Sequence, residues 1–167
     1  ASVDLVRTSE LFGPAVVIDV TAQAKADEDY AVSVADIEAW ESAHGAIPTG
    51  AIVLMRSGWP ERWTQGDAYY NRGEDGHLHF PGFSVEAAEF LVSERDIAGI
   101  GVDTGSVDPG NANSFPTHGV VNGSGGFHLE NLADMSALPE SGAYLIVAPI
   151  KIEGGSGGQV RVFAVVL

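Results

Sequence analysis

The chain has 167 residues, a net charge of -15 and no cysteine, and this length suits a single domain, residues 1–167, with a sizeable core. A surface with 23 acidic and 8 basic residues repels phosphate backbones and anionic membranes, so we expect neither nucleic acid nor a membrane as a partner. The lack of cysteine excludes disulfides and thiolate metal sites, and it is compatible with the cytoplasm, the compartment we expect.

Two apolar strands and a capped helix are predicted in the first third of the chain. Residues 15–20 read AVVIDV and predict a buried strand, apolar on both faces as central strands are. Ser33 followed by Asp36 is typical of a helix N-terminus, and Gly45 indicates where that helix ends. Residues 51–55 predict the second strand.

The later elements complete a mixed α/β pattern. Ser84 predicts the cap of a helix over 85–94, and residues 97–102 predict a third strand. The remaining predictions are a Gly-rich turn at 119–126, a short helix at 129–135, a strand at 143–148, a hairpin turn at 154–158 and a strand at 160–167. With no internal repeat and no linker, this order predicts one domain of α/β type.

His118 and Glu130 are the candidate metal ligands. A Gly-rich turn between them can bring an imidazole and a carboxylate together, and this donor pair suits a divalent ion such as zinc or manganese. The alternative is a histidine satisfied by hydrogen bonds and a surface or capping glutamate, since a His and a Glu at this spacing often occur together by chance.

The segment 60–81 is a long excursion without periodicity, and such loops in compact domains often carry function. Trp59, Trp63, Tyr69 and Tyr70 lie in it or next to it. These rings either line a pocket for a planar ligand or cover the edge of the core.

Asp103, Ser106 and Asp108 follow the strand at 97–102, at the end of a strand where α/β folds place ligand sites. The alternative for both aspartates is the loop and cap hydrogen bonding that Asp commonly makes. His77 and His79 form a possible metal pair that lacks a third ligand. The sequence leaves two roles for His128, a metal ligand or part of a pocket wall.

Several blocks, in this order, resemble the putative cyclase family, which includes bacterial kynurenine formamidase and isatin hydrolase. The blocks are V-V-I-D-V, L-M-R-S-G-W, F-P-G-F-S-V-E-A-A-E-F-L, G-V-D-T-G-S-V-D, H-x11-E-N-L and P-I-K-I-E-G-G-S-G-G-Q-V-R-V-F-A-V. The resemblance runs from about residue 15 to the end of the chain. It implies a swivelling β/β/α domain with a mixed, barrel-like sheet.

The resemblance also implies a function and a site. Family members are metal-dependent hydrolases of cyclic or aryl amides and related bonds, such as lactones. His118 and Glu130 match the family's downstream metal ligands, and the block with Asp103, Ser106 and Asp108 matches residues near the site. Trp59 joins these three in the expected substrate pocket. Gly105 stands where the family commonly has proline.

A second family motif, H-x-G-T-H-x-D-x-P-x-H, has no match in residues 1–15. In the family this motif supplies further metal ligands and the histidine that acts as base, so the catalytic residue here stays unknown. We therefore expect this chain to be the larger, C-terminal part of such a hydrolase, inactive and metal-poor alone. The alternative is a non-catalytic relative that binds or supports another molecule, and metal content separates the two.

Three structural expectations follow. The beginning of the chain should lie near His118 and Glu130, and the strand at 15–20 should lack a neighbour that the upstream segment normally provides. The aromatic excursion from Trp59 to Phe83 favours a homodimer or higher homo-oligomer.

Overall fold

The computed structural model describes residues 2–166. The strands are β1 Phe12–Asp19, β2 Ala31–Val32, β3 Ile52–Arg56, β4 Gly82–Phe83, β5 Gly99–Val102, β6 Phe127–Leu129, β7 Ala143–Pro149 and β8 Val160–Val166. The α-helices are α1 Thr21–Ala26, α2 Val34–His44, α3 Asp67–Tyr70, α4 Val85–Arg95 and α5 Pro116–Gly123, and short 3-10 turns lie at Val3–Leu5, Thr8–Glu10 and Trp59–Arg62. Among these helices none combines the length and hydropathy needed to cross a bilayer.

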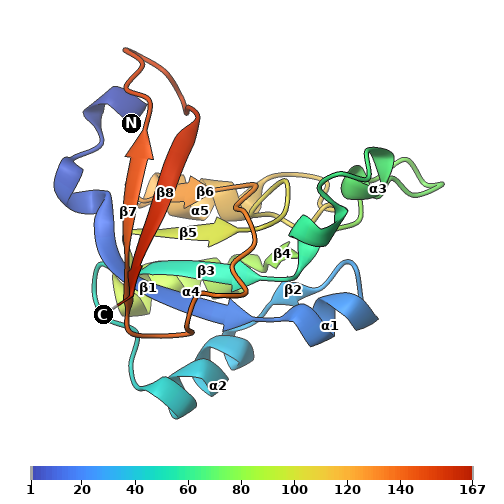
Figure 1. Ribbon diagram of the computed structural model, residues 1–167, viewed down its shortest axis with the longest axis horizontal. Coiled ribbons are helices and arrows are strands. Elements are labelled where there is room, and N and C mark those ends of the chain that lie inside the picture. Colours follow the sequence, from blue (N-terminus) through green and yellow to red (C-terminus); the bar gives the residue numbers. More distant parts are fainter. Residues whose placement is uncertain (1, 167) are drawn as a thin grey trace.

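The main sheet is mixed and has the order β6-β5-β3-β1-β7-β8. Strands β1, β3, β5 and β6 run parallel, whereas β7 is antiparallel to β1 and β8 is antiparallel to β7. Figure 1 shows β7 and β8 turned steeply away from the parallel strands, so the sheet curls into a half-barrel. The predicted fold class, an α/β domain with a mixed, barrel-like sheet, is confirmed.

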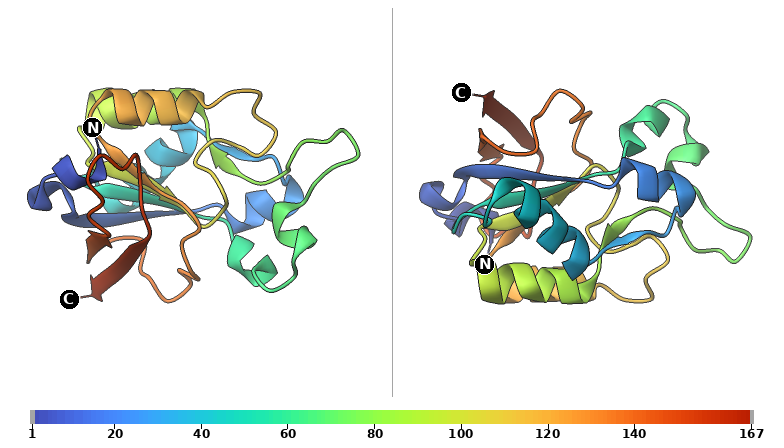
Figure 2. Two further views of the ribbon diagram at one scale, coloured as in Figure 1. Left: turned by 90° about the horizontal axis from the view of Figure 1, so that it is seen from above. Right: turned by 90° about the horizontal axis from the view of Figure 1, so that it is seen from below.

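Two apolar cores lie on opposite faces of this sheet. Val16 and Ile18 of β1 point to the core shared with α2, α4 and α5, while Ala15 and Val17 point to the core shared with β7 and the segment 130–142. Figure 2 shows helices α4 and α5 on one side of the sheet and the β7–β8 hairpin on the other. Because both faces are covered, the parallel strands read as continuous apolar runs in the sequence.

The helix boundaries that the sequence predicts are confirmed at α2 and α4. The Ser33 hydroxyl accepts from the backbone N of Asp36 at 3.3 Å, and the Asp36 carboxylate accepts from the backbone N of Ser33 at 2.8 Å. Gly45 ends α2 with a φ of 92°, a conformation that favours glycine. The Ser84 hydroxyl caps α4 by accepting from the backbone N of Ala87.

The prediction of a turn over 119–126 was wrong in part, because α5 extends through Gly123 and only the residues after it turn. The predicted helix at 129–135 was also wrong. Leu129 belongs to β6, and the backbone N atoms of Asn131 and Leu132 donate to carbonyls at the end of β5 instead of to a helical turn. Tertiary hydrogen bonds therefore override the local pattern in both segments.

Strand β1 pairs with β3 along residues 15–19, whereas β7 of the C-terminal hairpin pairs with it only along residues 12–15. Beyond Ala15 that second side has, among residues 2–166, a single backbone hydrogen bond, from the Val17 N to the Glu140 carbonyl at 2.9 Å, so the expectation that the strand at 15–20 lacks a neighbour stays a prediction. The predicted hairpin turn at 154–158 is confirmed by the β7–β8 pairing, although Leu167 lies outside the described residues. Several exposed apolar side chains lie on β1, β7 and β8, at Phe12, Ile146, Phe163 and Val165.

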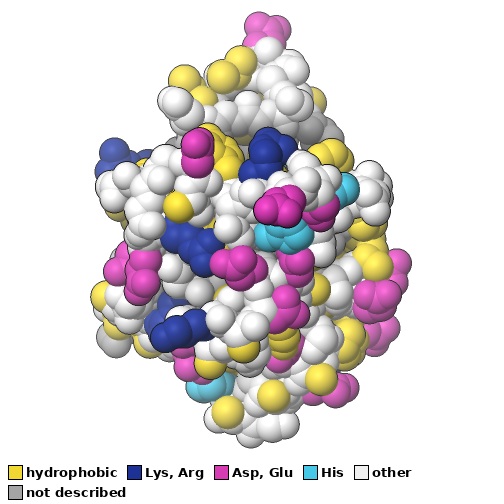
Figure 3. All heavy atoms as spheres, turned by 90° about the vertical axis from the view of Figure 1, so that its right-hand side faces the viewer, with side chains coloured by type: hydrophobic (Ala, Val, Ile, Leu, Met, Phe, Trp, Pro, Cys, Tyr) yellow, Lys and Arg dark blue, Asp and Glu magenta, His cyan; other side chains and the backbone are white. Residues whose placement is uncertain are grey.

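The excursion after β3 projects from the domain at the right of Figure 1. Its histidine His79 lies between two carboxylates, with Nδ1 2.8 Å from Asp29 and Nε2 3.2 Å from Asp75. Hydrogen bonds to these carboxylates raise the pKa of His79. Figure 3 shows histidine and acidic side chains side by side on this face. Both ring nitrogens of His79 are thus committed to carboxylates, which leaves none free for a metal pair with His77.

Candidate metal centre

The loop after β5 begins with Asp103, a buried carboxylate whose hydrogen bonds hold the neighbouring loop in place. Asp103 is 1% exposed and accepts from the Ser57 backbone N at 2.9 Å, the Ser57 hydroxyl at 2.6 Å and the Gly58 backbone N at 3.0 Å. Burial raises the pKa of Asp103, and these three donors oppose that rise. Asp103 therefore ties together the loops that leave the carboxyl ends of β3 and β5.

The same loop ends with a second buried carboxylate, Asp108, which meets the N-terminus of α5. It accepts from the backbone N of Thr117 at 2.8 Å and from the backbone N of His118 at 3.3 Å. The Thr117 hydroxyl donates to the carbonyl of Phe83 at 3.0 Å. Asp108 acts as a cap for α5 from a distant loop, and this tertiary cap explains why the helix forms where the sequence indicates a turn.

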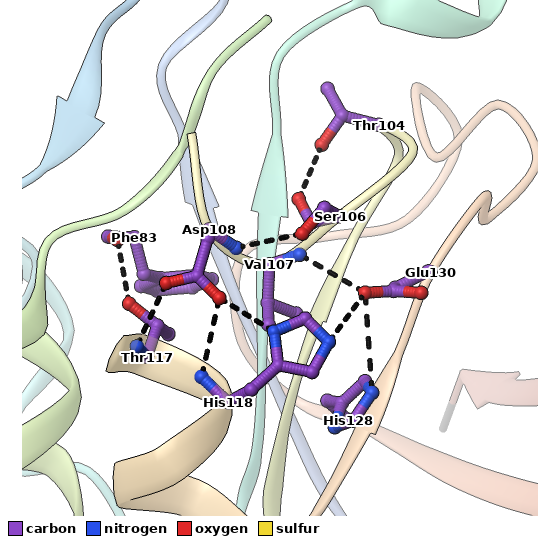
Figure 4. Close-up of polar contacts among 9 residues, drawn as sticks. All are labelled: Phe83, Thr104, Ser106, Val107, Asp108, Thr117, His118, His128 and Glu130. Atoms are coloured by element: carbon purple, nitrogen blue, oxygen red, sulfur yellow. Dashed lines mark hydrogen bonds and ion pairs between the residues drawn. The ribbon is translucent and has the colours of Figure 1, made fainter. Parts of the chain in front are cut away.

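His118 projects from the first turn of α5 between two carboxylates (Figure 4). Its Nδ1 lies 2.5 Å from the Asp108 carboxylate, and its Nε2 lies 3.2 Å from the Glu130 carboxylate. The prediction that His118 and Glu130 converge in space is confirmed. Their convergence comes from α5 and β6 packing together, since the segment that separates them consists of the rest of α5, a short turn and β6.

His128 joins this pair from strand β6. In an extended strand, side chains two residues apart share a face, so His128 points the same way as Glu130 just beyond the strand. Its Nε2 lies 4.0 Å from the Glu130 carboxylate, and its ring centroid is 4.2 Å from that of His118. Glu130 also accepts from the backbone N of Val107 at 3.3 Å, and burial raises its pKa while nearby His118 opposes the rise.

The imidazole of His128 is 23% exposed, but one of its nitrogens is buried without a partner in the described part of the chain. Its Nδ1 has no hydrogen-bond partner among residues 2–166. Burial, with a smaller effect from His118, lowers the pKa of His128 to about 4, so the ring is neutral near pH 7 and offers a lone pair. A buried polar group without a partner is costly, and a ligand that the chain itself does not supply would explain its retention.

These donors fit a divalent metal ion. One ligand atom each from His118, His128 and Glu130 lies within 4.8 Å of the other two. Two imidazole nitrogens and a carboxylate oxygen form a donor set that suits zinc and other divalent transition metals. Within the described part of the chain, no other group of three His, Asp or Glu side chains meets this condition.

A cavity of about 950 Å³ opens beside the cluster. His128 and Glu130 line it, together with Trp63, Asn131 and, from the beginning of the chain, Val6. The expectation that the beginning of the chain lies near the site is therefore confirmed. An apolar wall with a few convergent polar groups is the usual form of a small-molecule site.

The four residues expected in a substrate pocket lie elsewhere than on this cavity wall. Asp103 and Asp108 hold the loop in the ways described above, and the Ser106 hydroxyl accepts from the backbone N of Asp108 at 3.2 Å. Trp59 is 3% exposed, and its indole N–H donates to the Tyr69 carbonyl at 2.9 Å. The excursion instead contributes Trp63, which is 51% exposed, to the cavity.

His128 is the member of the cluster that the sequence left open. Its signal was the H-x-E spacing of His128 and Glu130, which places both side chains on one face if the segment is a strand. The strand was not predicted, because the Gly-rich residues before His128 indicate a turn. The pairing of β6 with β5 is what makes the segment extended.

Comparisons with known proteins match this chain to one family and to isatin hydrolases in particular. The sequence model of the family described as Putative cyclase matches residues 1–109. The isatin hydrolase of Roseibium aggregatum is 37% identical over 167 residues, and the match covers 98% of this chain and 63% of that protein. Two solved structures of isatin hydrolase A are each 40% identical and cover 99% of this chain. The one from Labrenzia aggregata has a TM-score of 0.94 with 65% of its chain covered, and the one from Ralstonia solanacearum has 0.95 with 64% covered. The chain thus spans slightly less than two thirds of the length of these relatives.

Proposed function

The chain belongs to the putative cyclase family, and from this premise we propose that it forms the larger part of a metal-dependent hydrolase that opens a cyclic amide. The observation that carries the proposal is the convergence of His118, His128 and Glu130 beside a cavity large enough for a small molecule. The similarity to isatin hydrolases supports the substrate class, since isatin is a cyclic aryl amide. Lactones and open aryl amides such as N-formylkynurenine are the next substrates to test.

In this proposal His118 and His128 bind zinc or manganese through neutral imidazoles, and Glu130 contributes the negative charge that offsets part of the ion's charge. When bound, the ion supplies Lewis-acid polarisation of the amide carbonyl and activates water. The half-buried position of Glu130 strengthens its attraction to a cation, because few water molecules screen it.

The cavity wall would hold the substrate. Trp63 offers a flat apolar surface for an aryl ring, and the carboxamide of Asn131 accepts a hydrogen bond from the Tyr69 hydroxyl. These two residues replace the buried Trp59 as our proposed substrate contacts. Trp59, Asp103, Ser106 and Asp108 we propose as supports that fix the loops around the cavity.

The first experiment measures metal content and hydrolysis together. Purified protein is loaded with zinc or manganese, its metal is quantified by mass spectrometry, and isatin hydrolysis is followed by absorbance. We expect weak metal uptake and no hydrolysis by the 167 residues alone. Co-expression with an upstream segment carrying H-x-G-T-H-x-D should raise metal content to near one ion or more per chain and restore hydrolysis.

Two outcomes would contradict the proposal. If the co-expressed form holds metal but hydrolyses neither isatin nor N-formylkynurenine, the substrate class is wrong. If no metal is retained in any form, and His118→Ala changes nothing, the protein is a non-catalytic relative. Rapid hydrolysis by the 167 residues unaided would instead mean that these residues complete the site themselves.

We also propose self-association, most simply as a homodimer. Support comes from exposed apolar side chains on the β7–β8 hairpin and β1, including Phe163, which is 52% exposed, and Phe12, which is 53% exposed. The aromatic excursion adds Trp63 and Tyr70, whereas its Trp59 and Phe83 are buried within the chain. Light scattering that gives a monomer mass at all concentrations would refute this proposal.

A further inference from the structure

Asp108 contacts both the backbone and the imidazole of the helix that carries His118. One carboxylate oxygen accepts from the backbone N of Thr117 at 2.8 Å. The other lies 3.3 Å from the backbone N of His118 and 2.5 Å from its ring Nδ1 (Figure 4). With an exposed side-chain fraction of 2%, this carboxylate competes with little water for these contacts.

We propose that Asp108 is a positioning residue that fixes the proton of His118 on Nδ1 and thereby directs the Nε2 lone pair toward His128 and Glu130. The inference rests on the proposed metal function and goes beyond it by assigning a role to a residue that does not touch the ion. A carboxylate can only accept hydrogen bonds, so it requires a proton on the imidazole nitrogen that faces it. A neutral imidazole with its proton on Nδ1 has its lone pair on Nε2, the atom 3.2 Å from Glu130.

Contacts that hold Asp108 in place also fix the orientation of the His118 ring. The Ser106 hydroxyl accepts from the Asp108 backbone N at 3.2 Å, and Gly82 lies so close that an added Cβ would be 2.6 Å from the Asp108 carbonyl carbon. The Thr117 hydroxyl ties the first turn of α5 to the carbonyl of Phe83. Since the loop, strand β4 and helix α5 fix one another, the ring of His118 has little freedom to turn away. Hydrogen-bonded partners of this kind orient metal-binding histidines in general.

Asp108→Asn tests this role. An amide has one accepting oxygen and one donating NH2 group. Of the two backbone contacts, we expect the shorter one, from the Thr117 backbone N at 2.8 Å, to retain the oxygen, so that the NH2 group faces Nδ1 and forces the proton onto Nε2. The lone pair is then turned away from His128 and Glu130. The helix cap keeps the Thr117 contact and loses the longer one at 3.3 Å from the His118 backbone N, so the thermal unfolding midpoint should fall only slightly.

The proton position is measured on the 167-residue chain, and zinc affinity is measured on the form co-expressed with the upstream segment, which is the form expected to hold metal. In long-range 1H–15N NMR of the metal-free protein, His118 should carry a strongly downfield Nδ1 proton that is lost in Asp108→Asn. Zinc affinity, measured by calorimetry or by competition with a chromophoric chelator, should fall roughly 10–100-fold in the variant. Asp103→Asn is the matched control, since Asp103 is equally buried in the same loop but contacts Ser57 and Gly58. It should leave the His118 proton in place.

The outcomes separate this inference from the proposed function. An unprotonated Nδ1 on His118 in the native protein would overturn the positioning role without any variant. So would a folded Asp108→Asn that keeps the native proton position and zinc affinity. If the co-expressed form with native Asp108 binds no zinc but Asp108→Asn still moves the proton, the metal function fails while the positioning role stands.

Discussion

Two histidines of this protein lie between pairs of carboxylates, and they differ in their surroundings. His118 lies 2.5 Å from Asp108 and 3.2 Å from Glu130, while His79 lies 2.8 Å from Asp29 and 3.2 Å from Asp75. The distances are nearly the same. The carboxylate of Asp108 is 2% exposed, however, whereas those of Asp29 and Asp75 are 30% and 54% exposed.

The difference shows that a pair of carboxylates around a histidine does not by itself mark a candidate metal centre. His118 has a second imidazole beside it and a cavity beyond, and it lies where parallel strands end. His79 ties an exposed loop to the segment after α1, and water can replace either of its partners. Glu130 and Asp29 are similarly exposed, at 27% and 30%, so it is the buried Asp108 and the third ligand that distinguish the candidate site from a surface contact.

The largest effect should come from His118→Ala compared with His79→Ala. Removing a ligand from a three-residue cluster should lower zinc affinity more than about 100-fold, beyond the loss typical of a supporting residue. His79→Ala should leave affinity unchanged. Calorimetric titration of both variants checks this, and equal losses in the two would erase the distinction between the sites.

The next effect concerns the packing that holds Asp108. Gly82→Ala places a Cβ 2.5–2.7 Å from the backbone of residues 107–109, which must shift. We expect a loss of about 1–3 kcal/mol in the free energy of unfolding, measured by urea denaturation, together with weaker zinc binding. Gly119→Ala in α5 meets no atom within 4 Å and should instead stabilise the protein by about 0.5–1 kcal/mol. A destabilised Gly119→Ala would show that the close approach at Gly82 is not the cause.

Replacing His128 should have a smaller effect on the free energy of unfolding, and it should stabilise the protein instead of destabilising it. Because its Nδ1 is buried without a partner among the described residues, His128→Phe should raise the metal-free unfolding free energy by about 1 kcal/mol while reducing zinc affinity. His77→Phe, at an exposed position, should change neither quantity. A loss of stability in metal-free His128→Phe would mean that the imidazole has a partner after all.

The smallest expected effect is a pH dependence of the contribution that His79, the surface histidine, makes to stability. Hydrogen bonds to Asp29 and then Asp75 raise the pKa of His79 above its ordinary value of 6.5. A group whose pKa is raised on folding stabilises the protein fully below its unfolded pKa and loses that contribution as pH rises through its folded pKa. His79→Gln should therefore lower the melting temperature more at pH 5.5 than at pH 8.5. A deficit that is equal at both pH values would rule out a contribution from the protonated ring.

The sequence predicted those features whose signal is local. The cap at Ser33, the glycine at 45 and the cap at Ser84 determine helix ends through contacts within one turn, and the structure has them as predicted. The apolar runs of β1 and β3 predicted buried strands because both of their faces are covered. The resemblance indicated His118 and Glu130, although neither residue alone distinguishes a ligand from a satisfied side chain.

The features that the sequence could not predict depend on contacts between distant segments. Helix α5 forms because Asp108, in a loop eight residues before Pro116, accepts from its first N–H groups. His128 joins the cluster only because β6 pairs with β5, and residues 12–15 of β1 gain a second neighbour only because the C-terminal hairpin folds back onto them. Local propensity determined where most elements begin and end. Hydrogen bonds and burial across the sheet decided which side chains meet, since these energies exist only once the chain is folded.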